Sequence, residues 1–241
     1  MATFVLVHGA WMGGWAWARV RNALREAGHN VFAPTLTGLG ERVHLSHPEI
    51  DLNTHIEDVV KVIEYEDLHR IVLVGHSYGG MVISGVAERV PQRLSHLVYL
   101  DAMIPKHGES AANLLDAEMV ATLTAKAQDS WRIPMAFPLE TLGITSEGDM
   151  RWVNHRFTPQ PLKTVTTPIK LSNPAAAALP RTFIHCTRPA FPLADAFAQR
   201  AKAAGFKFLE LPTGHAAPVT APKELATLLQ KFVPALAAPS D

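Results

Sequence analysis

A serine between two glycines is the residue of this sequence best suited to nucleophilic chemistry. It occurs in Gly75-His-Ser-Tyr-Gly79, which fits the pattern G-x-S-x-G and follows an apolar run at residues 70–74. In that pattern a sharp turn from a strand into a helix projects the serine hydroxyl from the edge of a sheet. The flanking glycines leave room where the two backbones approach, and Gly80 extends that room into the first helical turn. We therefore predict that Ser77 is a nucleophile, and we set aside an ordinary Gly-Ser turn as the alternative.

A serine hydroxyl is a weak nucleophile at neutral pH, so acyl transfer requires a base beside it and an acid that orients the base. Among twelve histidines, His215 is the best placed, because it follows the last predicted strand in a short loop. That loop is expected at the same sheet edge as Ser77. His76 is interpreted as a filler of the turn. His44 and His47 could share a helix face, but no third ligand accompanies them, so no metal site is expected.

Strands and helices alternate over most of the sequence, as is typical of an α/β fold with a parallel sheet covered by helices on both faces. About six strands are predicted, at residues 3–7, 30–34, 71–74, 97–100, 182–186 and 206–211. Helices are predicted at residues 15–27, 79–89, 192–204 and 222–233, with a further helix that carries Ile56 to Ile63 on one face. Asn53 or Thr54 is the expected N-cap of that further helix.

The alternation stops between residues 105 and 180, directly after the strand that ends at Asp101. This stretch is rich in proline and shows helical periodicity, with a helix expected at 114–127, shorter pieces at 131–137 and 151–157, and no clear strand. We interpret it as a helical lid over the carboxyl edge of the sheet, where α/β sheets bind ligands. The predicted domains are therefore a core, residues 1–104 and 181–241, and a lid, residues 105–180.

The composition of the chain argues against several classes of partner. Lysine and arginine number 22, as do aspartate and glutamate, so there is no basic excess that would indicate a nucleic-acid partner. No apolar run reaches the ~20 residues of a membrane helix, and the first residues lack a signal-peptide pattern. A single cysteine, Cys186, is typical of a reducing compartment, so we predict a cytoplasmic location. The oligomeric state is not readable, and a homodimer is one open alternative.

The chain resembles the α/β-hydrolase fold superfamily, and within it the small lidded group of plant methylesterases, the salicylate-binding methyl salicylate esterase, hydroxynitrile lyases and their bacterial relatives. The resemblance lies in Val7-His-Gly-Ala-Trp11, in the motif around Ser77, and in Gly214-His215 after a strand. It implies an oxyanion hole made by two backbone N–H groups, which here belong to Ala10 and Tyr78. No cofactor is expected.

The resemblance also separates hydrolysis from other chemistries. Hydroxynitrile lyases of this group carry threonine where Gly9 stands and lysine where Ala216 stands, while haloalkane dehalogenases and epoxide hydrolases use aspartate at the position of Ser77. A serine hydrolase of a small, fairly apolar carboxylic ester or lactone is therefore predicted. Two alternatives remain open: a hydroxynitrile-lyase-like or other cofactor-free C–C cleaving enzyme, and a slow-turnover small-molecule binding protein.

The acid of the triad departs from the family pattern. Relatives usually carry it in the stretch that corresponds to residues 186–192, where this sequence has no carboxylate. The fold offers a second location, the end of the strand after the nucleophile helix, and Asp101 stands there. A carboxylate at the tip of an apolar strand is costly unless it is paired, and a protonated His215 would pair it. The alternatives are that Asp101 caps the next turn or bonds backbone amides, or that a carbonyl or water orients His215. Asp195 is expected to point elsewhere.

Substrate contacts are predicted at two places. Gly9 and Trp11 lie beside the oxyanion loop, although Trp11 could equally be a packing residue. Trp131, Phe137 and Trp152 would wall the pocket from the lid, or simply pack the lid down.

Overall fold

A computed structural model describes residues 1–127, 129 and 131–233, and its centre is a six-stranded sheet in the order β2-β1-β3-β4-β7-β8. All neighbouring strands pair in parallel, so their carboxyl ends lie at one edge. The strands are β1 (Thr3–Val7), β2 (Asn30–Phe32), β3 (Ile71–His76), β4 (Leu94–Leu100), β7 (Arg181–Cys186) and β8 (Lys207–Leu211). The predicted α/β class and six-stranded sheet are confirmed.

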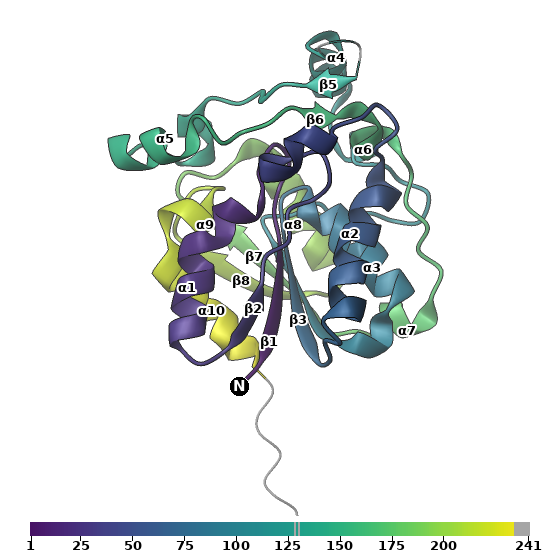
Figure 1. Cartoon of the computed structure of the whole chain (residues 1–241), viewed down its shortest axis with the longest axis vertical. Helices are drawn as coiled ribbons and strands as arrows, with labels where there is room; N and C mark the ends of the chain where they lie inside the picture. The colour runs from purple at the N-terminus through teal and green to yellow at the C-terminus, as the bar shows by residue number, and fades with distance from the viewer. Residues whose placement is uncertain (128, 130, 234–241) are drawn as a thin grey trace, which may run out of the picture.

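Helices cover both faces of this sheet (Figure 1). One face is covered by α1 (Ala18–Glu26) and α10 (Pro222–Leu229), with the short α9 (Ala217–Thr220) beside them. The other face is covered by α2 (Leu52–Tyr65), α3 (Gly79–Arg89) and α8 (Pro192–Ala203). Short 3-10 turns at Gly14–Trp17 and Gln230–Phe232 account for the rest of the helices predicted at 15–27 and 222–233.

The helix α2 begins one position before the predicted caps. Asp51 is its N-cap, and the Asp51 carboxylate accepts the Thr54 backbone N–H at 2.9 Å. The Thr54 hydroxyl in turn accepts the Asp51 N–H at 3.4 Å, which completes a capping box. The assignment of the cap to Asn53 or Thr54 was therefore wrong, because Thr54 is the third helical residue and serves as the partner of the cap.

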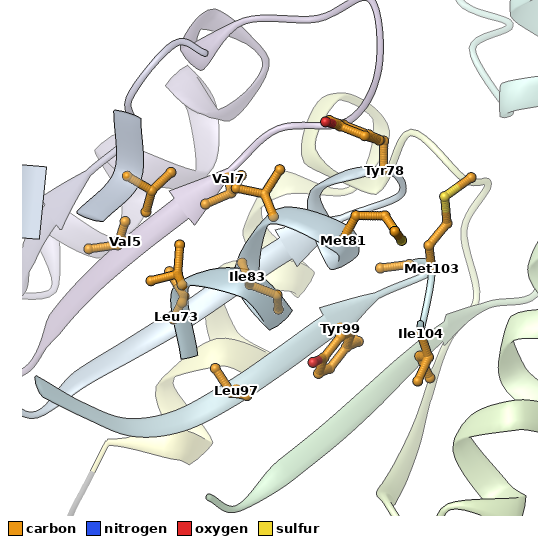
Figure 2. Packing of buried hydrophobic residues seen from close by; sticks show 14 of the residues in the cluster. Val5, Val7, Leu73, Tyr78, Met81, Ile83, Leu97, Tyr99, Met103 and Ile104 are labelled. Carbon is orange, nitrogen blue, oxygen red and sulfur yellow. The ribbon is translucent and has the colours of Figure 1, made fainter. Parts of the chain in front are cut away.

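Two hydrophobic clusters fill the space between the sheet and its two helical layers. Because side chains alternate along a strand, Phe4 and Leu6 of β1 enter one cluster while Val5 and Val7 enter the other. Figure 2 shows part of the second cluster, where Leu73 of β3 lies close to side chains of α3. Every residue of β3 is buried, which explains why its sequence is a continuous apolar run and not an alternating one.

Residues 105–180 form an inserted segment between β4 and β7. The part that ends with helix α6 (Leu162–Thr166) crosses above the carboxyl ends of the strands, whereas the later helix α7 (Pro174–Ala177) lies beside α3 (Figure 1). Its helices are α4 (Ala117–Ala125), α5 (Glu147–Val153), α6 (Leu162–Thr166) and α7 (Pro174–Ala177), with 3-10 turns at Ala112–Leu114 and Leu139–Leu142.

The inserted segment also contains a small antiparallel sheet that the sequence analysis did not predict. It joins β5 (Arg132–Ile133) to β6 (Gln160–Pro161). Two residues are too few to produce a period-two pattern, so the sequence carried no signal for either strand. The helical piece expected at 131–137 is therefore corrected to a strand and an irregular connection. Among the described residues, no helix is long and apolar enough to cross a membrane.

Candidate active site

Ser77 lies in the turn between β3 and α3 with a left-handed backbone, at φ 53°. A non-glycine residue is strained there and keeps this conformation only where its surroundings hold it. The Ser77 N–H donates to the Leu100 carbonyl at 3.2 Å, and the Ser77 carbonyl accepts the N–H groups of Gly80 and Met103, both at 3.0 Å. A Cβ on Gly80 would lie 2.1 Å from the Met103 carbonyl oxygen, so this tight approach requires glycine.

His215 and Asp101 come together at the same edge of the sheet. Asp101 directly follows β4 and is fully buried, and its Oδ2 lies 2.9 Å from Nδ1 of His215. A carboxylate can only accept, so Nδ1 carries the proton, and Nε2 of the neutral ring is free to act as a base. His215 is itself buried and lines the same cavity as Ser77. The structure thus brings all three predicted residues into one site.

A second histidine contacts Asp101 from the other side. Oδ1 of Asp101 accepts Nδ1–H of His185 at 3.1 Å and the Cys186 backbone N–H at 3.0 Å. Burial would raise the pKa of Asp101, but the hydrogen bonds from His185 and His215 lower that pKa below its usual value on balance. In return, the hydrogen bond to Asp101 raises the pKa of His185. Asp101 is therefore held as a carboxylate.

His185 was missed by the sequence analysis, because a histidine within a strand carries no signal of which carboxylate it meets. Its Nε2 lies 3.2 Å from Oδ1 of Asp195, whose side chain is mostly exposed. Asp195 thus contacts His185 from the outside, as expected of a residue that points away from the base. Cys186, the neighbour of His185, has a fully buried side chain.

His76, interpreted as a filler of the turn, has a more specific contact. Its Nε2 donates to the backbone carbonyl of His215 at 2.8 Å, and the two rings lie 4.8 Å apart between centroids. Burial lowers the pKa of His76 to about 3, so its ring is neutral. On the other side of His215, Phe191 stacks on the imidazole with 4.3 Å between centroids. The base is therefore fixed by packing as well as by Asp101.

The loop after β1 presses against the turn that carries Ser77. A Cβ on Gly9 would lie 3.0 Å from Cβ of Ser77, so the loop comes as close as a residue without a side chain allows. Ala10 and Tyr78 line the cavity beside Ser77. Within the part of the chain that the structure describes, neither of their backbone N–H groups donates to a protein acceptor. Both N–H groups are thus open to a ligand.

The wall of the cavity is almost entirely apolar, and the inserted segment contributes just under half of the lining residues. Gly9, Trp11 and Phe137 line it, as predicted, and the ring of Phe137 is nearly perpendicular to those of both Trp11 and Phe191. The other apolar side chains of the wall include Leu115, Leu123, Ile133, Met135, Leu142, Phe157 and Val165. No charged side chain is among the described residues that line the cavity.

Two of the predicted substrate contacts are corrected by the structure. Trp152 lies outside the cavity wall. Its ring is nearly perpendicular to that of Trp15, with 5.4 Å between the ring centroids, and the Arg19 guanidinium lies 4.6 Å from its centroid. Trp131 also lies outside the wall, beside the guanidinium of Arg132. Both residues are aromatic and in the inserted segment, and only the tertiary structure shows which face of that segment they occupy.

The chain is similar to known proteins over most of its length. The model described as the Alpha/beta hydrolase family matches residues 4–228. A carbendazim hydrolyzing esterase from Nocardioides sp. (strain SG-4G) is 41% identical, over 95% of this chain and 98% of that protein. Salicylic acid-binding protein 2 of Nicotiana tabacum is 30% identical over 58% of this chain and 54% of its own length. The structure of an extracellular alpha/beta-hydrolase from a Paenibacillus species superposes with a TM-score of 0.84 at 27% identity, covering 96% of this chain and 99% of that one.

Proposed function

The chain belongs to the alpha/beta hydrolase family, and from this premise we propose that it is a serine esterase that cleaves a small, fairly apolar carboxylic ester or lactone. One observation carries the proposal. Ser77, in its strained turn, lines the same apolar cavity as His215, whose Nδ1 lies 2.9 Å from the buried Asp101. The carbendazim hydrolyzing esterase, which is similar over nearly its whole length, supports the same reaction class.

In the proposed mechanism Ser77 attacks the ester carbonyl carbon while His215 Nε2 takes the hydroxyl proton. Asp101 keeps the proton of His215 on Nδ1 and stabilises the imidazolium that forms. The negative charge on the former carbonyl oxygen is met by the N–H groups of Ala10 and Tyr78, and each such donor is worth ~2.7–4 kcal/mol. His215 then protonates the leaving alcohol. Water, deprotonated by His215, attacks the acyl-serine and releases the acid.

The substrate class follows from the cavity. Because its described wall carries no charged side chain, an ionised substrate would lose its hydration without gaining a counter-charge. We propose that residues 105–180 act as a lid that supplies nearly half of this wall. An uncharged ester with an aromatic or aliphatic acyl group fits such a wall, and carbendazim, the compound in the name of the relative, is a suitable probe.

The two alternative functions are less well supported. A hydroxynitrile-lyase-like reaction lacks the lysine and threonine of the lyases, since Ala216 and Gly9 occupy those positions. One of the relatives named above is an esterase that is similar to this protein over nearly the whole chain. A slow-turnover binding protein would keep a reactive serine but consume little substrate, so turnover numbers separate it from an esterase. The cytoplasmic location and a homodimeric state both remain predictions.

The test is the hydrolysis of p-nitrophenyl acetate, p-nitrophenyl butyrate and carbendazim by the wild type and by Ser77→Ala. We expect the wild type to hydrolyse at least the short nitrophenyl esters with many turnovers, and Ser77→Ala to lose that activity. Ser95→Ala is the matched control and should keep full activity, because Ser95 lies near the amino end of β4, the end opposite to Asp101. Equal activity of the wild type and Ser77→Ala would refute the proposed function.

A further inference from the structure

Trp11 directly follows Ala10, and each of its three polar atoms is bonded to the inserted segment. Its backbone N–H donates to Oε1 of Gln160 at 3.1 Å, and its carbonyl accepts the Thr158 N–H at 2.9 Å. Its indole N–H donates to the Ile133 carbonyl at 3.0 Å. Trp11 also has a left-handed backbone, at φ 63°, which a bulky residue keeps only where it is held. The inserted segment therefore fixes the conformation of this turn.

Gln160 is fully buried, and its amide can have only one orientation. The Thr164 hydroxyl donates to the Pro161 carbonyl at 2.6 Å, so towards Gln160 it can only accept. Nε2 of Gln160 therefore faces Thr164, at 2.6 Å, and Oε1 faces the Trp11 N–H. Both ends of this amide are thus satisfied within the protein, although Gln160 also borders the cavity.

The residue of the second proposed oxyanion donor, Tyr78, has its side chain held by other buried polar groups. The side chain of Tyr78 donates its hydroxyl to Nδ1 of His55 at 3.0 Å, because Nε2–H of His55 donates to the Thr37 carbonyl, also at 3.0 Å. Burial lowers the pKa of His55 to about 4, so its ring stays neutral and Nδ1 can accept. The Tyr78 side chain is thus anchored through His55 of α2, independently of the contacts that Gln160 makes.

We propose that Gln160 is a positioning residue for the oxyanion hole, acting from the inserted segment through the Trp11 amide. Holding the Trp11 N–H fixes the peptide plane between Ala10 and Trp11. The Ala10 N–H belongs to the preceding peptide plane, which is joined to this one at the Ala10 Cα, so fixing the second plane restricts the rotation of the first. An oxyanion donor is effective only if it is oriented before the charge develops. This inference rests on the proposed function, and it assigns to Gln160 an effect on the rate of the chemical step and none on ground-state binding.

The experiment compares Gln160→Met with the wild type. Methionine keeps the side-chain length but cannot accept the Trp11 N–H well. We expect kcat for p-nitrophenyl acetate to fall about 10- to 100-fold, less than the loss of a whole donor, with KM within about threefold. The affinity for a trifluoromethyl ketone, which forms an oxyanion on the serine, should fall by the same factor as kcat.

A matched pair on α6 provides a second variant and a control. Thr164→Val removes the partner of Nε2 of Gln160 and should lower kcat in the same direction, and this variant decides the question if Gln160→Met does not fold. Thr166→Val changes an exposed threonine of the same helix and should leave kcat and KM unchanged.

The outcomes separate this inference from the function on which it rests. If the wild type neither hydrolyses esters nor binds the ketone, both are overturned. If the wild type is active and folded Gln160→Met keeps its kcat and ketone affinity within twofold, only the positioning role is overturned. A rise in KM at constant kcat would also overturn it, because Gln160 would then be a direct substrate contact.

Discussion

The two sides of the Ser77 hydroxyl are built from different parts of the chain. On the base side, His215, Asp101 and His185 all come from the carboxyl ends of strands in the central sheet, or from the loops directly after them. On the oxyanion side, the turn at Trp11 is bonded at each polar atom to the inserted segment. In the proposed mechanism, the geometry of proton transfer therefore depends on the core, whereas the geometry of charge stabilisation depends on how the inserted segment sits.

The two sides also differ in charge. The base side is organised around one buried carboxylate, whose pKa is lowered on balance by hydrogen bonds from His185 and His215. The oxyanion side uses neutral groups, among them His55, whose pKa burial lowers to about 4. A neutral surrounding does not attract protons or counter-ions that would compete for the developing oxyanion. Substitutions on the two sides should therefore differ in size and in pH dependence.

The largest effect is expected on the base side, from Asp101→Asn. Asparagine keeps the shape of the side chain but would favour the wrong tautomer of His215, with the proton on Nε2. We therefore expect kcat to fall by about 10⁴ with little change in KM. The measurement is the steady-state hydrolysis of p-nitrophenyl acetate. Asp195→Asn is the matched control, since this mostly exposed carboxylate lies 3.2 Å from the outer nitrogen of His185, and it should keep near-wild-type kcat. Near-full activity of Asp101→Asn would show that the Asp101 carboxylate is not needed to orient His215.

A middle-sized effect is expected from Phe137→Ala, because Phe137 touches both sides. Its ring lies 5.8 Å from Trp11 and 5.2 Å from Phe191, which stacks on the base. Losing the apolar wall should lower kcat/KM for p-nitrophenyl butyrate by about 10-fold, chiefly through KM, given ~1.5–3 kcal/mol for a buried phenylalanine. Trp152→Ala changes an aromatic residue of the inserted segment that lies outside the cavity, and it should leave KM unchanged. An equal rise in KM for both variants would mean that the cavity wall extends to Trp152.

The smallest effect is expected from His185, which supports Asp101 without touching the base. His185→Ala should lower kcat only a few-fold, because the Cys186 N–H still holds Oδ1 of Asp101. His185→Asn should restore kcat, since its amide nitrogen can replace Nδ1 as the donor. No loss in His185→Ala, or no recovery in His185→Asn, would show that the second imidazole is not part of the base side.

The difference in stability between the wild type and His185→Asn should depend on pH. The pKa of His185 is raised in the folded protein, so a proton on His185 favours the folded state. That contribution is complete below the ordinary pKa of about 6.5 and is lost as the pH rises through the folded-state pKa. The free energy of unfolding of the wild type should thus exceed that of His185→Asn by more at pH 5.5 than at pH 9. Urea unfolding at the two pH values measures this difference, and a larger gap at pH 9 would contradict it.

The base side was largely predictable from the sequence, and the oxyanion network was not. Ser77 is marked by a local pattern of glycines, and the fold places His215 and Asp101 at known strand ends, so their meeting followed from topology. Gln160 meets Trp11 across 149 positions of sequence, and no local pattern marks a glutamine that will be buried. The same holds for His185, and for Trp131 and Trp152, whose orientation depends on how an irregular segment folds back on the core.

In the proposed mechanism Ser77 is the activated nucleophile, between the base side and the oxyanion side. The most direct test of this role is to treat the folded protein with a fluorophosphonate and to locate the adduct by peptide mass spectrometry, with Ser77→Ala as the control. We predict a single adduct, on Ser77, and no labelling of the variant. An unlabelled wild-type protein, or an adduct on another residue that persists in Ser77→Ala, would contradict it.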